Sequence, residues 1–173
     1  MYQNKRWLWK ENGFESKESM DSSHKPVLNL IKGLNSVSNI MDLGCGNGYL
    51  LKKSGLVPYG IDTNPKAIKH AKNHILPLYS SHFYVKNINE LQWNEKFDVV
   101  VVSIGRFFEM NKREVNNLKR SLSSYARNIV VYAYSDWLDK AENLKSLCRN
   151  FKFKCNRISE KESSAACLVS TEH

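Results

Sequence analysis

The sequence predicts an α/β fold in which helices cover both faces of a mostly parallel sheet. Three observations point to it. Short apolar runs alternate with helical stretches between residues 39 and 153, the pattern of strands joined by right-handed crossover helices. The run at 97–102 contains four consecutive valines, which indicates a strand buried on both faces. A glycine-rich turn follows the first apolar run, at the edge where such sheets bind ligands.

Local patterns place the individual elements of this fold. Asn64 is a suitable helix cap, and Pro65 suits the first turn because its missing N–H has no partner there. One expected helix begins at residue 49, and three others cover residues 64–73, 112–125 and 137–149. The last two strands have no helix between them, so they predict an antiparallel hairpin at the edge of a seven-stranded sheet. The expected strands cover 39–43, 58–62, 82–85, 97–102, 128–133, 151–157 and 165–170.

Residues 1–37 precede the first strand and are expected to form a flap over the carboxyl ends of the strands. They contain a predicted helix at 25–34, with Ser22 or Ser23 as its cap. They also contain three aromatic residues, which either stack on a planar substrate or pack the flap itself: Trp7, Trp9 and Phe14.

Length and composition describe one globular domain. The chain has 173 residues, of which 42% are hydrophobic and 25% charged, which is ordinary globular composition and argues against disorder. No apolar run approaches the roughly 20 residues needed to cross a bilayer. The first residues lack the apolar segment of a signal peptide. We therefore expect a soluble cytoplasmic protein with no membrane partner.

The four cysteines give no sign of a metal site. They stand at positions 45, 148, 155 and 167, without a Cys-x-x-Cys pair and without a histidine at zinc-finger spacing. No other cluster of histidines and acids has the spacing of metal ligands. We expect reduced, mostly buried thiols and no bound metal.

The charge is strongly basic and uneven along the chain. The formal net charge is +9, and residues 110–157 contain eleven basic and four acidic residues. Such an excess either attracts nucleic acid or another polyanion, or belongs to solvated helix faces. Charge alone leaves both interpretations open.

The glycine-rich turn is the most informative motif. Glycines at 44, 46 and 48 let the backbone turn sharply and approach a ligand closely. A dinucleotide-binding fingerprint would require glycine at 49, where Tyr49 stands, and no lysine follows as in a phosphate-binding loop. Asp62 lies twenty residues after Asp42, at the end of the second strand, where a carboxylate can accept from both hydroxyls of a ribose.

The string at 40–48, followed by Gly60-Ile61-Asp62 and Asn64-Pro65, resembles the class I S-adenosylmethionine-dependent methyltransferases of the small methyltransferase-domain type. The resemblance covers about residues 38–134. It implies a Rossmann-like three-layer sandwich, a donor-binding domain at 38–173, S-adenosylmethionine as donor and S-adenosylhomocysteine as product. Asn87 stands where an acid usually accepts from the adenine amine, and its carbonyl oxygen can still accept. The implied donor-binding residues are Asp42, Gly44, Cys45, Gly46, Asp62, Thr63, Asn87, Ile88 and Ser103.

Three residues are candidates for catalysis. In this family the donor is already activated, so alignment provides most of the rate and a base is needed only for a protonated acceptor. Arg106 and Glu109 follow the fourth strand. Either Arg106 binds a carboxylate of the acceptor and Glu109 takes a proton from an amine or hydroxyl, or the two residues form a local ion pair. His24, at the start of the predicted flap helix, is a base with a near-neutral pKa or a solvent contact.

The nature of the acceptor stays open. The stretch at 103–109 lacks the Pro-Pro-aromatic motif of amide and nucleobase N-methylating enzymes, which counts against enzymes of that type. The leading hypothesis is methyl transfer to nitrogen or oxygen of a small molecule or modified peptide, by a monomer or homodimer. The alternatives are an RNA methyltransferase, which the basic charge favours, and a non-catalytic subunit that binds the donor.

Overall fold

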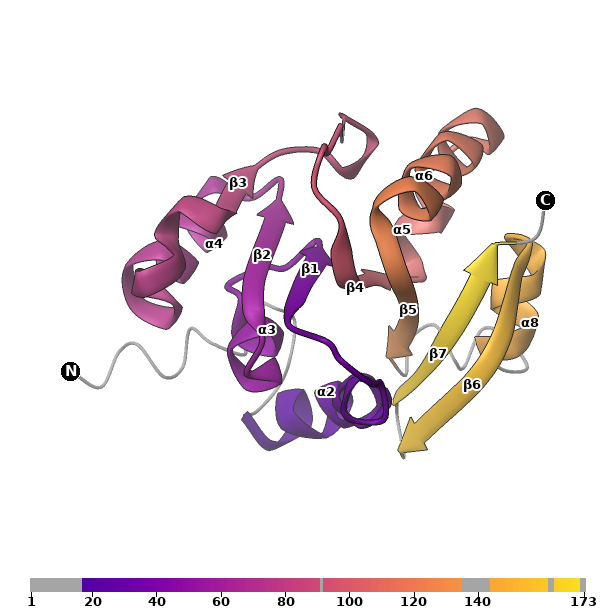
Figure 1. Ribbon diagram of the computed structural model, residues 1–173, viewed down its shortest axis with the longest axis horizontal. Coiled ribbons are helices and arrows are strands. Elements are labelled where there is room, and N and C mark those ends of the chain that lie inside the picture. Colours follow the sequence, from indigo (N-terminus) through magenta and orange to yellow (C-terminus); the bar gives the residue numbers. More distant parts are fainter. Residues whose placement is uncertain (1–16, 91, 135–143, 162–163, 172–173) are drawn as a thin grey trace.

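A computed structural model describes residues 17–90, 92–134, 144–161 and 164–171 of the chain (Figure 1). The helices are α2 (Lys17–Lys32), α3 (Tyr49–Ser54), α4 (Pro65–His70), η1 (Ala71–Ile75), η2 (Pro77–His82), η3 (Ile88–Glu90), α5 (Gly105–Phe108), α6 (Lys112–Tyr125) and α8 (Leu144–Asn150). The strands are β1 (Asn39–Leu43), β2 (Val57–Asp62), β3 (Phe83–Val85), β4 (Phe97–Ser103), β5 (Ala126–Tyr134), β6 (Phe153–Lys161) and β7 (Ser164–Thr171).

The seven strands form one sheet in the order β3-β2-β1-β4-β5-β7-β6. Strands β1 to β5 run parallel to one another, whereas β7 runs antiparallel to both β5 and β6. This confirms the predicted seven-stranded sheet with an antiparallel hairpin at one edge. The strand order reverses between β1 and β4, so their carboxyl ends form the crevice in which open α/β sheets bind ligands.

Two apolar layers enclose the sheet, and β4 contributes to both. Val99 and Val101 face one layer together with α2, α3 and α4, whereas Val100 and Val102 face the other with α5, α6 and α8. All four valines are fully buried, as their consecutive order predicts. Burying each contributes about 1.5–3 kcal/mol, so β4 is a stable base for the residues that follow it.

Helix boundaries agree with local capping signals where these are present. The Asn64 Oδ1 accepts from the backbone N of Lys66 at 3.0 Å and of Ala67 at 3.3 Å, as expected for the cap of α4. The helix predicted at 64–73 is divided into α4 and the π-helical η1. Helix α6 has the predicted bounds and begins at a capping box on Asn111. Of the helix predicted at 137–149, residues 137–143 lie outside the described residues.

The N-terminal helix differs from the prediction. It begins at Lys17 rather than at residue 25, so Ser22 and Ser23 lie inside it and are not caps. Pro26 suggested a helix start, but here it is internal, and its missing N–H releases the carbonyl oxygen of Ser22. The Ser164 Oγ of β7 donates to that oxygen at 3.4 Å, which explains how the helix continues through Pro26.

Helix α2 packs on the sheet through Val27, Leu30 and Ile31, all buried. It is therefore part of a covering layer, and only part of the segment expected to be a flap is described. The three aromatic residues of that segment, Trp7, Trp9 and Phe14, lie outside the described residues.

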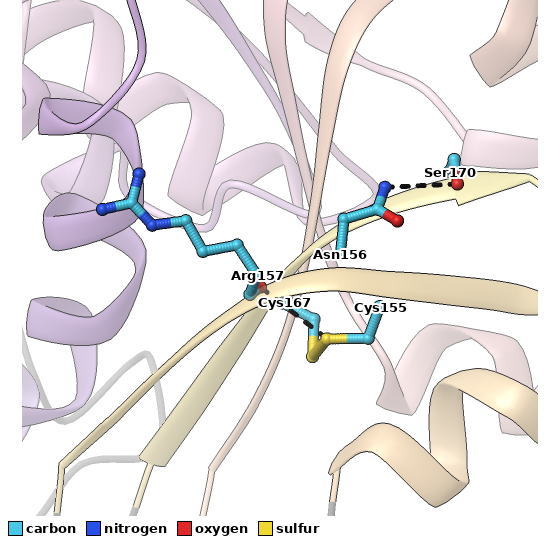
Figure 2. The surroundings of a disulfide bond; sticks show 5 residues. All are labelled: Cys155, Asn156, Arg157, Cys167 and Ser170. Atoms are coloured by element: carbon cyan, nitrogen blue, oxygen red, sulfur yellow. Dashed lines mark hydrogen bonds between the residues drawn. A yellow bond between two sulfur atoms is a disulfide. The ribbon is translucent and has the colours of Figure 1, made fainter.

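The C-terminal hairpin contains a disulfide between Cys155 and Cys167 (Figure 2). The expectation of reduced thiols was therefore wrong for this pair, because neighbouring antiparallel strands bring the two Cα atoms to 5.6 Å. Cys45 and Cys148 are free and buried, as expected.

A β-bulge interrupts the register of β6 between Cys155 and Arg157. A bulge turns the following side chain to the opposite face. Cys155 accordingly packs with the layer of α8, whereas the Arg157 Nη1 donates to the carbonyl oxygen of Gly33 at 3.4 Å, just beyond α2. The bulged strand is also joined to β7 by a hydrogen bond of 3.2 Å from Asn156 Nδ2 to Ser170 Oγ (Figure 2).

Candidate active site

Two adjoining cavities open at the carboxyl ends of the central strands. Their volumes are about 400 Å³ and about 160 Å³, and four residues line both: Gly44, Asp62, Arg106 and Glu109. Every residue that sequence reasoning selected for donor binding or catalysis lines one of the two. The larger is lined by His24, Asp42, Gly44, Cys45, Gly46, Asp62, Ser103, Arg106 and Glu109. Thr63, Asn87 and Ile88 line the smaller.

The glycine-rich turn folds back onto the end of β2. The backbone N–H groups of Gly44 and Cys45 both donate to the carbonyl oxygen of Ile61 at 2.9 Å. Gly44 has a φ of +90°, a conformation in which L side chains are strained. Gly60 has no room for a side chain, because a Cβ there would lie 2.7 Å from both Cys45 Sγ and a Phe83 ring carbon. These glycines hold the turn close to β2, which leaves its outer side open to the cavities.

Asp62 fixes the turn through both carboxylate oxygens. Its Oδ2 accepts from Gly46 N at 2.9 Å, and its Oδ1 accepts from Asn64 N at 2.8 Å. The residue is only 8% exposed, yet it lines both cavities. Each carboxylate oxygen has a further lone pair, so Asp62 can hold the turn and accept from ligand hydroxyls at the same time.

Asp42 is buried at 2% exposure at the end of β1, and its Oδ1 has no hydrogen-bond partner among the described residues. Burial raises the pKa of its carboxyl from 3.8 to about 7, and the negative charge of Asp62 adds to the shift, whereas Arg106 opposes it. A buried oxygen without a protein partner calls for an explanation, and contact with a bound ligand is one. A cationic group, such as the ammonium or sulfonium of S-adenosylmethionine, would fit this oxygen.

The smaller cavity contains the predicted adenine-side residues. The Asn87 Oδ1 accepts from the backbone N of Asn89 at 3.0 Å, so this amide is oriented by its own turn and retains a second lone pair. Ile88 is buried and supplies an apolar wall. This combination of an apolar wall and one oriented carbonyl oxygen suits a planar heterocycle.

Arg106 and Glu109 lie between the two cavities. Atoms of the Arg106 guanidinium approach to 3.0–3.4 Å from the position that a Cβ on Gly44 would occupy. The Arg106 Nη1 also lies 3.7 Å from Glu109 Oε2, and the two side chains are 38% and 70% exposed. The sequence left acceptor binding and a local ion pair as alternatives; the ion pair is present, and it lines the cavities.

His24 lies within α2 rather than at its N-terminus, and it is 5% exposed. Burial, together with the charge of Lys53, lowers the pKa of the imidazole to about 3, although Asp21 opposes the shift. The expectation of a near-neutral pKa was therefore wrong. Its ring lies 6.3 Å from that of Tyr49, in the wall of the larger cavity, where a neutral imidazole can exchange hydrogen bonds with a ligand.

Sequence reasoning missed several cavity residues. Tyr132 lies at the carboxyl end of β5, in register with Ser103, and lines the larger cavity. Its position at a strand end was a signal that could have found it. Asn47 and Tyr49 also line this cavity, and the Asn47 Oδ1 accepts from Tyr49 N at 3.3 Å. The described residues contain no cluster of histidines, cysteines or acids that could bind a metal ion, and no helix among them is long and apolar enough to span a membrane.

Comparisons with known proteins agree with this geometry. Residues 34–169 match the model of a family described as "Methyltransferase domain". The PH0226 protein of Pyrococcus horikoshii OT3 is 15% identical with a TM-score of 0.70, over 99% of this chain and 100% of that one. The N-methyltransferase NodS of Bradyrhizobium japonicum WM9 is 16% identical with a TM-score of 0.67, over 92% of this chain and 100% of NodS.

The glycopeptide N-methyltransferase MtfA, solved in complex with S-adenosyl-L-methionine, is also similar. It is 7% identical with a TM-score of 0.65, over 87% of this chain and 94% of MtfA. At these identities the likeness concerns the fold. No curated protein is similar enough in sequence to give a significant match.

Proposed function

Because the chain belongs to the methyltransferase-domain family and is an S-adenosylmethionine-dependent methyltransferase, we propose that it methylates a nitrogen or oxygen of a small molecule or modified peptide. The observation that carries this proposal is the pair of adjoining cavities. The smaller, at about 160 Å³, suits the adenine end of the donor, and the larger, at about 400 Å³, suits its amino-acid end and a compact acceptor. NodS and MtfA are N-methyltransferases, the latter of glycopeptides, which supports a small or peptide acceptor.

The proposed donor site uses the residues that surround the glycine-rich turn. Asp42 meets the ammonium group, Asp62 accepts from the ribose hydroxyls, and Asn87 accepts from the adenine amine. The backbone of Gly44 and Gly46 lies against the methionine part. When bound, S-adenosylmethionine supplies a methyl group on a sulfonium sulfur, activated for in-line displacement. The unpartnered oxygen of Asp42 is the observation that supports binding of a cation here.

The proposed acceptor site occupies the outer part of the larger cavity. Arg106 binds an anionic group of the acceptor. Glu109, which is 70% exposed, takes the proton of an acceptor that arrives protonated. His24 remains neutral and orients the acceptor by hydrogen bonding. These residues mainly align the acceptor atom with the methyl group, since alignment provides most of the rate.

One observation favours RNA as a second candidate acceptor. The exposed face of α6 forms a shallow surface hollow of about 380 Å³ lined only by cationic and amide side chains: Lys112, Arg113, Asn116, Asn117 and Arg120. Among the described residues no carboxylate forms an ion pair with these three cations. The hollow offers no aromatic ring for base stacking, which single-stranded RNA normally uses, so we rank RNA second.

Calorimetric titration with S-adenosylmethionine and S-adenosylhomocysteine tests the donor site. We expect micromolar binding of both, little changed between low and moderate salt. An acceptor screen that follows release of S-adenosylhomocysteine then covers small amines, hydroxy acids, peptides and RNA. No binding of either ligand would contradict the proposal, whereas turnover of RNA alone, with a steep fall in affinity as salt increases, would establish the second candidate.

A further inference from the structure

Arg106 lies where the proposed donor site and the proposed acceptor site meet. It lines both cavities, and its Nε, Nη2 and Cζ atoms lie 3.0, 3.1 and 3.4 Å from the position of a Cβ on Gly44. The guanidinium therefore occupies the space immediately above Gly44. The proposed function assigns the same space to the amino-acid end of the donor. The two cannot be there together.

The charges around Arg106 explain why its guanidinium lies inward. Asp42 and Asp62 are both buried at the floor of the cavities, and Arg106 is the cation whose charge opposes the raised pKa of Asp42. The guanidinium thus partly balances the negative charge of Asp42. The donor would bring its ammonium group to the same acid, so it can replace Arg106 electrostatically as well as sterically.

The contact on the outer side of Arg106 is loose. Its distance to Glu109 is 3.7 Å, and Glu109 is 70% exposed, so this ion pair holds the side chain only weakly. Arg106 itself is 38% exposed and lies in α5, a helix of one turn. Its long side chain can therefore turn outward by rotamer changes, without movement of the sheet or of the glycine-rich turn.

We propose that Arg106 is an internal counter-ion that the donor displaces, and that the displaced guanidinium then binds a carboxylate or phosphate group of the acceptor. This inference rests on the proposed function and deepens it in two ways. It names the anionic group of the acceptor as a carboxylate or phosphate, because a guanidinium recognises planar or tetrahedral oxyanions through paired hydrogen bonds. It also orders the reaction, since the acceptor site becomes complete only after the donor has bound.

Calorimetry of S-adenosylhomocysteine binding to Arg106→Gln tests the displacement. At pH 8.5, where Asp42 of the wild-type protein is ionised, we expect the variant to bind about three- to tenfold more tightly, because no guanidinium competes for the space above Gly44. Arg106→Lys retains a shorter cationic side chain, so its affinity for S-adenosylhomocysteine should lie between those of the wild-type protein and Arg106→Gln. The matched control is Arg149→Gln on α8, an exposed arginine outside both cavities, and its affinity should stay within twofold of wild type.

A second measurement follows the guanidinium directly. Arginine modification by phenylglyoxal, located by peptide mass spectrometry, should be faster at Arg106 when S-adenosylhomocysteine is bound and unchanged at Arg149. Protection of Arg106, or weaker binding by Arg106→Gln, would overturn the inference and would identify Arg106 as a residue that holds the donor. Equal affinities would overturn it as well. If the wild-type protein binds no S-adenosylhomocysteine, the proposed function itself fails. That result differs from the outcomes that overturn only the inference about Arg106, because in those the wild-type protein still binds the ligand.

Discussion

Replacing Asp42 by asparagine should stabilise the protein while weakening its proposed ligand. The folded chain keeps a proton on Asp42 up to a pKa of about 7, whereas the ordinary value is 3.8. The unfolded chain releases this proton at lower pH, so the folded state loses stability as the pH rises from about 4 to 7, and the whole penalty is present above 7. A shift of about three units corresponds to about 4 kcal/mol. Asparagine has nearly the same shape and does not ionise, so it avoids this penalty.

Urea unfolding of the wild-type protein and of Asp42→Asn, from pH 5 to pH 8, measures the effect. We expect the variant to be more stable throughout, with an advantage that grows by about 2–3 kcal/mol over this range. Asp98→Asn is the control of opposite sign, because hydrogen bonds from Ser38 lower the pKa of Asp98. That variant should lose stability at pH 8.

The same asparagine should weaken S-adenosylhomocysteine binding at pH 8 by about ten- to a hundredfold, which corresponds to about 1.5–3 kcal/mol for a hydrogen bond to a charged group. Calorimetry measures this change. An Asp42→Asn protein that is less stable than wild type at pH 8 would refute the reasoning, because it would mean that the carboxylate is ionised and well partnered. A stability difference independent of pH would refute it equally.

Other substitutions test the remaining residues. Asp62→Ala should lower S-adenosylhomocysteine affinity by about 1–3 kcal/mol in calorimetry, because ribose hydroxyls lose a charged acceptor; unchanged affinity would exclude the ribose assignment. Glu109→Gln should slow methyl transfer yet leave donor affinity within twofold, and normal turnover would mean that no base acts there. His24 has a pKa of about 3, so its NMR signals should not titrate between pH 5 and 8, and a midpoint near 6.5 would contradict its buried position. Cys155→Ser should reduce the free energy of unfolding by about 3 kcal/mol, as estimated for a crosslink closing about 12 residues; reducing agent should abolish the difference from wild type.

The parts of the fold that local sequence determines could be predicted. The four valines of β4, the Asn64 cap and the glycines at 44–48 each act through their own backbone or immediate neighbours. The carboxyl ends of parallel strands meet at one edge, so residues that directly follow β1, β2 and β4 could be assigned to one site. This is why the selected residues line the two cavities.

Features that depend on distant partners could not be predicted. Pro26 is tolerated inside α2 because Ser164, far along the chain, donates to the freed carbonyl oxygen. The register of β6 on β7, in which Cys155 comes within reach of Cys167, includes a bulge that the sequence pattern does not predict. The burial that lowers the pKa of His24 follows from the packing of α2 on the sheet. In each case the missing information was a tertiary contact.

The bulge in β6 affects whether two molecules of this protein can associate by pairing their strand edges. Strand β6 is the outermost strand of the hairpin edge, and an exposed strand edge is a template for pairing with a strand of another molecule. A bulge breaks the regular spacing that such a template needs, and charged side chains are exposed along the strand at Lys154, Arg157 and Glu160. The disulfide between Cys155 and Cys167 joins β6 covalently to β7, so β6 cannot separate from β7 and exchange with the same strand of another molecule. These features disfavour pairing of this edge with a strand of another molecule.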